Sequence, residues 1–218
     1  MISQIHSDLI SMQDRKYRDF NISILGETSY DVIGIRIPQL RAYAKELLKK
    51  DNIVFKDKYY EEVLVHGFYI AGKRCDFKTK IKMIEEYLPL IDSWGLCDSF
   101  ISSLKDIKKN KEYYYKYVLK YLKSNKEFYQ RYGLVVLLNY YIDDNYLNDL
   151  YKIIKTQKYK AYYSKMAGAW LLSYLFMFYF DETVKFVSNN NIDEFVYKKG
   201  IQKAKDSYRL SKKGIQIP

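Results

Sequence analysis

The sequence predicts an all-α protein. Only 9 glycines and 3 prolines occur in 218 residues, which is few for a chain that turns often at loops. Lysine, leucine, glutamate and isoleucine are abundant, and apolar residues recur with helical periodicity, whereas strand-like alternation is hard to find. We therefore expect about a dozen helices of roughly 10 to 20 residues joined by short links.

Five helices are expected in the first half of the chain, over residues 2–25, 38–50, 59–71, 77–87 and from 94 onward. The first is expected to end near Gly26. An irregular crossing at residues 33–38 follows, and Pro38 is expected at the first position of the second helix, where its missing N–H costs nothing. Pro89 marks the boundary before the fifth helix, because the residue before a proline disfavours helical geometry.

The second half is expected to form helices over residues 111–122, 128–141, 146–154, 159–180, 183–187 and 193–205. Ser124 with Glu127 three residues later forms a capping-box pattern ahead of the helix at 128. Because the helices follow one another in pairs with short links, we predict an α-solenoid of HEAT-like repeats. A compact helical bundle is the alternative. A solenoid would offer a concave face long enough to hold a nucleic-acid duplex.

Length and composition indicate one globular domain over residues 1–218. The formal net charge of +11 favours an anionic partner, nucleic acid first. The excess of lysine over arginine, together with many tyrosines and isoleucines, is also what an AT-rich genome would produce, so the charge alone does not establish DNA binding.

The chain carries few signals of other protein classes. Residues 1–25 are amphipathic and charged, unlike a signal peptide, and the apolar run at 167–180 is short for a membrane span. A cytoplasmic location without membrane association is therefore expected. The two cysteines and two histidines form no ligand-spaced cluster, so we expect no metal and no other cofactor.

Trp94 and Asp98 form the most informative pair. Four residues apart on a helix, they share one face, which continues through Ile101 and Leu104 toward packed protein. A carboxylate beside an indole on a mostly apolar stripe is costly to place, which points to a functional site. The alternative is a buried aspartate that pairs with a lysine or caps a neighbouring helix.

Two further segments place unusual residues in apolar helices. Arg131 is the only arginine in a long central region and suits a bidentate phosphate or carboxylate contact, or else a partnership with Asp98 or a helix C-terminus. Trp170 follows small residues that allow close helix packing, so a core tryptophan is the simplest interpretation.

The order of the motifs is more specific than any one of them. They are Gly34-Ile35-Arg36-Ile37-Pro38-Gln39-Leu40-Arg41, Trp94 with Asp98, Gln130-Arg131, Lys165-Met166-Ala167-Gly168-Ala169-Trp170 and Lys203-Ala204-Lys205-Asp206-Ser207-Tyr208-Arg209. This series resembles the AlkD-like DNA alkylation repair proteins, a family of DNA glycosylases built from HEAT-like repeats, and it covers nearly the whole chain.

The resemblance implies excision of N3- or N7-alkylated purines from double-stranded DNA by cleavage of the N-glycosidic bond, without base flipping. Because nothing in the chain demands a lysine Schiff base, we also predict that the enzyme does not cleave the strand. The resemblance further implies that Trp94 and Trp170 contact the deoxyribose of the lesion and that Asp98 is the catalytic carboxylate. Arg131 corresponds to a DNA-backbone contact, and we expect Lys165 and Arg41 to bind DNA as well.

The chain departs from the family pattern at one position. Ser173 stands three residues beyond the second tryptophan, where better-characterised members carry an arginine. We expect a monomer that binds DNA through a concave, basic face. The alternative function is a HEAT-like nucleic-acid-binding module that lacks glycosylase activity.

Overall fold

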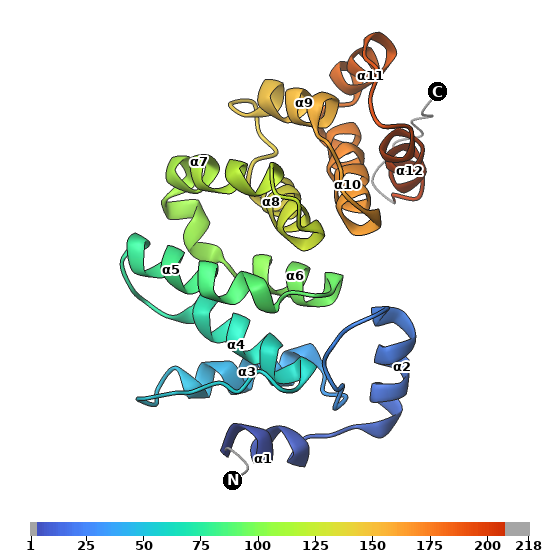
Figure 1. Ribbon diagram of the computed structural model, residues 1–218. Coiled ribbons are helices and arrows are strands. Elements are labelled where there is room, and N and C mark those ends of the chain that lie inside the picture. The colour runs from blue at the N-terminus through green and yellow to red at the C-terminus, as the bar shows by residue number, and fades with distance from the viewer. Residues whose placement is uncertain (1–3, 208–218) are drawn as a thin grey trace. The chain divides into compact units, whose positions relative to one another are not determined.

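The computed structural model describes residues 4–207, and this part of the chain is built from helices. Twelve α-helices and two short 3-10 helices occur there, and the extended pairing among these residues is a single isolated bridge between Asp31 and Tyr59 (Figure 1). The prediction of an all-α protein is confirmed, whereas the solenoid arrangement stays a prediction. Within residues 4–207, no helix is both long enough and apolar enough to cross a membrane.

The chain divides into two compact units, residues 1–110 and 111–218. The helices of the first unit are α1 (Gln4–Ser11), α2 (Arg15–Leu25), α3 (Ile37–Leu47), α4 (Tyr60–Gly72), α5 (Phe77–Tyr87), η1 (Leu88–Leu90), α6 (Trp94–Ile101) and η2 (Lys105–Lys109). Those of the second are α7 (Lys111–Leu122), α8 (Glu127–Tyr140), α9 (Leu147–Thr156), α10 (Tyr162–Phe178), α11 (Phe180–Asn189) and α12 (Glu194–Lys205). The single domain over 1–218 stays a prediction.

Helix α4 is the centre of the first unit, and α1, α3, α5 and α6 all pack against it (Figure 1). It is buried almost throughout because its sequence is apolar around the whole helix rather than along one stripe. The hydroxyl of Tyr87 donates to the Val63 carbonyl at 3.0 Å, and Gly67 leaves the space that this ring fills. Helices α4 and α5 therefore approach closely at this point.

Two buried glutamates at the start of α4 hold the preceding chain. Glu61 accepts backbone N–H groups of the crossing at residues 33–35, and Glu62 accepts those of Lys56 and Lys58 at 2.8 and 3.0 Å. Glu62 also bonds the ring of His6 from α1. Acidic side chains suit the first turn of a helix, where the helix dipole is positive.

The opposite end of α4 is closed by a lysine. The ammonium group of Lys80 is buried and donates to the carbonyl oxygens of Ile70, Ala71 and Lys73 at 2.6, 3.3 and 2.6 Å. It also pairs with Asp106 at 3.2 Å. A cation at this end satisfies carbonyl groups that have no partner within the helix.

The predicted single helix over residues 2–25 is wrong. The chain forms two helices, because Asp14 caps α2 by accepting the Tyr17 N–H at 3.0 Å, in an extended conformation that α1 cannot continue through. The Asp14 N–H in turn donates to the Gly34 carbonyl at 2.9 Å, which ties the break to the crossing.

Helix α10 is the centre of the second unit, with its most extensive contacts to α8 and α12 and further contact to α11, while α7 packs on α8 (Figure 1). Gly200 allows α12 to approach the Leu172 side chain on α10, since a Cβ there would lie 2.8 Å from that side chain. The helix predicted over 159–180 begins later and ends earlier, because Tyr179 leaves helical geometry and α11 begins at Phe180.

The predicted capping box is also wrong. Lys126, not Ser124, precedes the first turn of α8, and the Ser124 hydroxyl accepts the Lys126 N–H at 3.1 Å within the loop. The carboxylate of Glu127 accepts the N–H of Tyr163 in the first turn of α10. A tertiary contact between two helices thus replaces the local one that the sequence pattern indicated.

Candidate nucleic-acid interface

The first group of candidate residues lies on α6. Trp94 begins this helix and Asp98 follows one turn later, so the two side chains share a face as their spacing predicts. Trp94, Asp98 and Ser99 are half-buried, whereas the other residues of α6 are buried. The face is fully buried at Ile101 and Leu104, as expected, whereas Trp94 and Asp98 are partly exposed.

Close packing against α4 fixes the start of α6. Gly95 lies against the hydroxyl of Tyr60, where any larger side chain would collide with the phenol. Burial raises the pKa of Tyr60 above its ordinary value, so the phenol is neutral and can pack in this dry contact. The rotation of α6 that presents Trp94 and Asp98 is set by this contact.

Arg41 fixes the end of α6. Its guanidinium donates to the hydroxyl groups of Ser103 and Ser102 at 2.5 and 3.2 Å, and it lies 4.3 Å from the centre of the Phe68 ring. Burial lowers the pKa of Arg41, although the residue as a whole is exposed. A cation suits this position because the C-terminus of a helix carries partial negative charge.

The Gly34 crossing receives its geometry from Glu61. The carboxylate accepts the N–H groups of Ile33 and Gly34 at 2.8 and 2.7 Å and that of Ile35 at 3.4 Å. Burial raises the pKa of Glu61, and these three donors oppose that shift. Gly34 has a φ of +90°, which explains why glycine stands at this position of the motif.

The second group lies on α8 and α10. Arg131 is buried and donates to the carbonyl oxygen of Tyr163 at 3.1 Å, in the first turn of α10. The positive end of the α10 dipole disfavours a cation there, and the carboxylate of Glu127, bonded to the Tyr163 N–H, offsets this. Arg131 is thus held in place between two helices.

Trp170 belongs to a stripe of half-buried side chains along one face of α10. Its members, spaced at helical intervals and here named the α10 stripe, are Tyr163, Met166, Trp170 and Tyr174. The rings of Trp170 and Tyr174 meet edge to face, with centroids 6.1 Å apart. Because Arg131 contacts Tyr163, it lies at the N-terminal end of the stripe that holds Trp170.

Lys165 and Ser173 lie off this stripe. The ammonium group of Lys165 pairs with Asp193 at 3.1 Å and lies 5.9 Å from the centre of the Phe195 ring, so it faces the start of α12. Ser173 is buried, and its hydroxyl donates to the Trp170 carbonyl at 2.7 Å. The position at which the family pattern carries an arginine therefore lies inside the packed part of α10.

Within residues 4–207, no group of three or more histidine, cysteine, aspartate or glutamate side chains could hold a metal ion. The first unit thus brings Trp94 and Asp98 together, with Arg41 at the end of the same helix. The second unit brings Arg131 and Trp170 to one stripe and directs Lys165 elsewhere.

The profile of one protein family, described as DNA alkylation repair enzyme, matches residues 5–203. This chain belongs to that family. The resemblance noted from the sequence motifs is confirmed, and DNA is the substrate that membership in the DNA alkylation repair family implies. No curated protein matches the chain.

The family match spans all six candidate residues of this DNA alkylation repair protein. The closing motif begins at Lys203, where the match ends, and its last two residues, Tyr208 and Arg209, lie outside the part of the chain that the structure describes.

Sequence reasoning missed the residues that position this interface. Glu61, Glu127 and Tyr60 hold the crossing, α10 and α6, respectively. The sequence held a partial signal for Glu61 and Glu127, because acidic residues are favourable in the first turn of a helix, but it did not show which backbone N–H groups they bind. Nothing in the local sequence marks Tyr60, whose role depends on a glycine 35 residues away.

Proposed function

We propose that this protein is a monofunctional DNA glycosylase that excises N3- or N7-alkylated purines from double-stranded DNA without flipping the base. The observation that carries the proposal is the partly exposed face of α6, where a mostly buried helix leaves Trp94 and Asp98 half-buried one turn apart. Membership in a DNA alkylation repair family supports it.

The proposed reaction needs few catalytic groups from the protein. An N3- or N7-alkylated purine is cationic, so when the bond between C1′ and the base nitrogen breaks, its electron pair neutralises the base and no general acid is needed. Positive charge develops on the sugar, as in other glycoside cleavages. Water then adds to C1′ and releases one proton, which leaves an abasic site and an intact strand.

The proposed roles follow from this charge. The Asp98 carboxylate stabilises the cationic sugar and orients the attacking water. The indole faces of Trp94 and Trp170 attract a cation and limit the access of other water molecules. Arg131, Lys165 and Arg41 are proposed to contact the DNA backbone, each from a position already fixed by contacts within the protein.

The proposal includes the arrangement of the protein on its substrate. The helices form a HEAT-like α-solenoid with a concave, basic face, and the duplex lies along that face. The protein acts as a monomer, because a duplex must reach α6 unobstructed by a second subunit. It acts in the cytoplasm and without a cofactor.

The experiment that tests the proposal is single-turnover release of 7-methylguanine from a defined duplex. We expect Asp98→Asn to lower the rate at least about 100-fold while DNA affinity, measured by fluorescence anisotropy, stays within about twofold. Asp51→Asn is the matched control, because it makes the same change at an exposed loop position of the same unit, and it should release base at the wild-type rate.

Equal rates for wild type and Asp98→Asn would rule out Asp98 as the catalytic group. Strand nicks that accumulate without added base or heat would contradict a monofunctional enzyme. Salt-sensitive binding to DNA with no lesion preference and no base release would instead support the alternative, a nucleic-acid-binding module without chemistry.

A further inference from the structure

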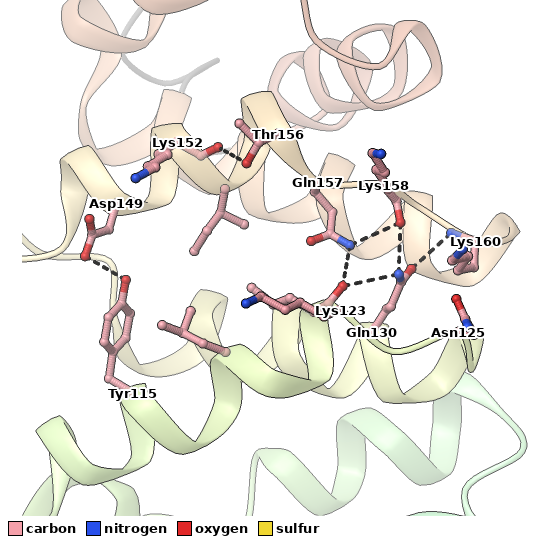
Figure 2. Close-up of a pocket in the computed structure, with 13 residues that line it drawn as sticks. Tyr115, Lys123, Asn125, Gln130, Asp149, Lys152, Thr156, Gln157, Lys158 and Lys160 are labelled. Carbon is pink, nitrogen blue, oxygen red and sulfur yellow. Dashed lines mark hydrogen bonds between the residues drawn. The ribbon is translucent and has the colours of Figure 1, made fainter.

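A hollow of about 670 Å³ lies between α7 and α9, entirely within the second unit (Figure 2). Its volume falls in the range of small-molecule sites, about 300 to 1,000 Å³. Leu119, Leu122 and Ile153 line it with apolar side chains, and we call these three the apolar lining. The hollow contains none of the six candidate residues of the DNA interface.

At each end of the hollow, side-chain hydrogen bonds connect α7 or the loop after it with α8 or α9. At one end the Tyr115 hydroxyl of α7 donates to Asp149 of α9 at 2.8 Å (Figure 2). At the other end Gln130 donates to the Ser124 carbonyl, and Gln157 donates to the Leu122 carbonyl at the end of α7. Along α9 the lining runs from Asp149 to Thr156, a rise of about 10 Å. This length suits a small ligand and is too short for a docked helix of three or more turns.

Positive charge surrounds the hollow. Four exposed lysines line it, and we call them the lysine rim: Lys123, Lys152, Lys158 and Lys160. In the described part of the chain none of their ammonium groups forms an ion pair. Asp149 is the acidic residue among the described lining residues, and it is already bonded to Tyr115. Four cations against one carboxylate favour a ligand that carries phosphate groups.

Two side-chain amides in the lining retain hydrogen-bonding capacity. The carboxamide of Asn125 and the Oε1 atom of Gln157 make no hydrogen bond among residues 4–207, whereas Nε2 of Gln157 donates to the Leu122 carbonyl at 2.8 Å. An amide presents a donor and an acceptor side by side, which matches the edge of a nucleobase. A plain acyl chain would leave both groups unused.

We propose that this hollow binds a nucleoside phosphate. The phosphates lie among the ammonium groups of the lysine rim, the nucleoside lies against the apolar lining, and the amides of Asn125 and Gln157 contact the base edge. The proposal concerns a site apart from α6, so it does not depend on glycosylase activity.

The test is isothermal titration calorimetry of the full chain with three probes: ADP, pyrophosphate and adenosine. We expect ADP to bind at least tenfold more tightly than either fragment, because each fragment uses only half of the site. The variant Lys123→Gln/Lys152→Gln should weaken ADP binding at least tenfold. The matched control, Lys116→Gln/Lys155→Gln, removes the same charge from exposed lysines of α7 and α9 outside the lining and should change the affinity less than twofold.

Three results would overturn the proposal. Equal losses in the two double variants would show that general surface charge attracts ADP. Pyrophosphate binding as tightly as ADP would show that the hollow does not recognise a nucleoside. A wild-type protein that fails to bind ADP, while the Lys123/Lys152 variant loses affinity for duplex DNA, would assign the lysine rim to a DNA-backbone contact instead.

Discussion

Replacing Gly34 with alanine is expected to lower the free energy of unfolding by about 1.5 to 3.5 kcal/mol, the sum of two contributions. A residue with a side chain at a φ of +90° costs about 1–2 kcal/mol. The added Cβ would also lie 2.6 Å from the Asp14 carbonyl oxygen and 2.7 Å from the Arg18 Cα atom, both of the backbone. The crossing must therefore shift, which breaks the Asp14 N–H to Gly34 carbonyl bond, worth about 0.5–1.5 kcal/mol.

The assay is urea unfolding followed by circular dichroism, with the midpoint and slope fitted for each variant. Gly72→Ala is the control, because the new methyl group at the end of α4 meets only the mobile tip of the Leu48 side chain and alanine favours a helix by up to about 1 kcal/mol. A Gly34→Ala midpoint equal to that of wild type, or an equal loss in both variants, would refute the argument that the crossing requires glycine.

Three further changes test contacts described above. Lys80→Met removes the donor to three carbonyl oxygens at the end of α4 and should lower the free energy of unfolding by about 1.5–3 kcal/mol. The control Lys82→Met, at an exposed position, should leave that free energy nearly unchanged, and the urea midpoints of the two variants are compared with that of the wild type. Gln130→Leu leaves the loop groups that this buried amide binds without partners and should cost about 1–3 kcal/mol, and an unchanged midpoint would contradict this. The Tyr17 N–H holds the pKa of Asp14 below its ordinary 3.8, so the contribution of this cap to stability is present above pH 3.8 and is lost as the pH falls through the lowered pKa; an NMR titration midpoint at or above 3.8 would contradict it.

The helices were predictable where one periodic pattern stood between clear breaks. The ranges 77–87 and 111–122 agree with α5 and α7 at both ends. The break between α1 and α2 was not predicted, because apolar spacing continues across it and only Asp14 signals a new helix. The Ser124 pattern failed for the opposite reason: the local signal was present, but Glu127 bonds α10 instead.

The candidate site, too, was predictable from the sequence only in part. The shared face of Trp94 and Asp98 follows from their spacing alone, so the sequence was sufficient. The Arg41 contact with Ser103 joins residues 62 positions apart, and no local pattern encodes it. The direction of Lys165 toward Asp193 likewise depends on where α12 packs, which is a property of the folded unit.

Glu61 and Glu62 have a consequence for the order in which the chain folds during synthesis. The partners of these two carboxylates, in α1, the 33–35 crossing and the 56–58 loop, all precede them in the sequence. Until the start of α4 has left the ribosome, these groups lack their carboxylate partners. The segments before residue 61 therefore gain these carboxylate contacts only when the start of α4 emerges, and α5 and α6 pack against α4 after that.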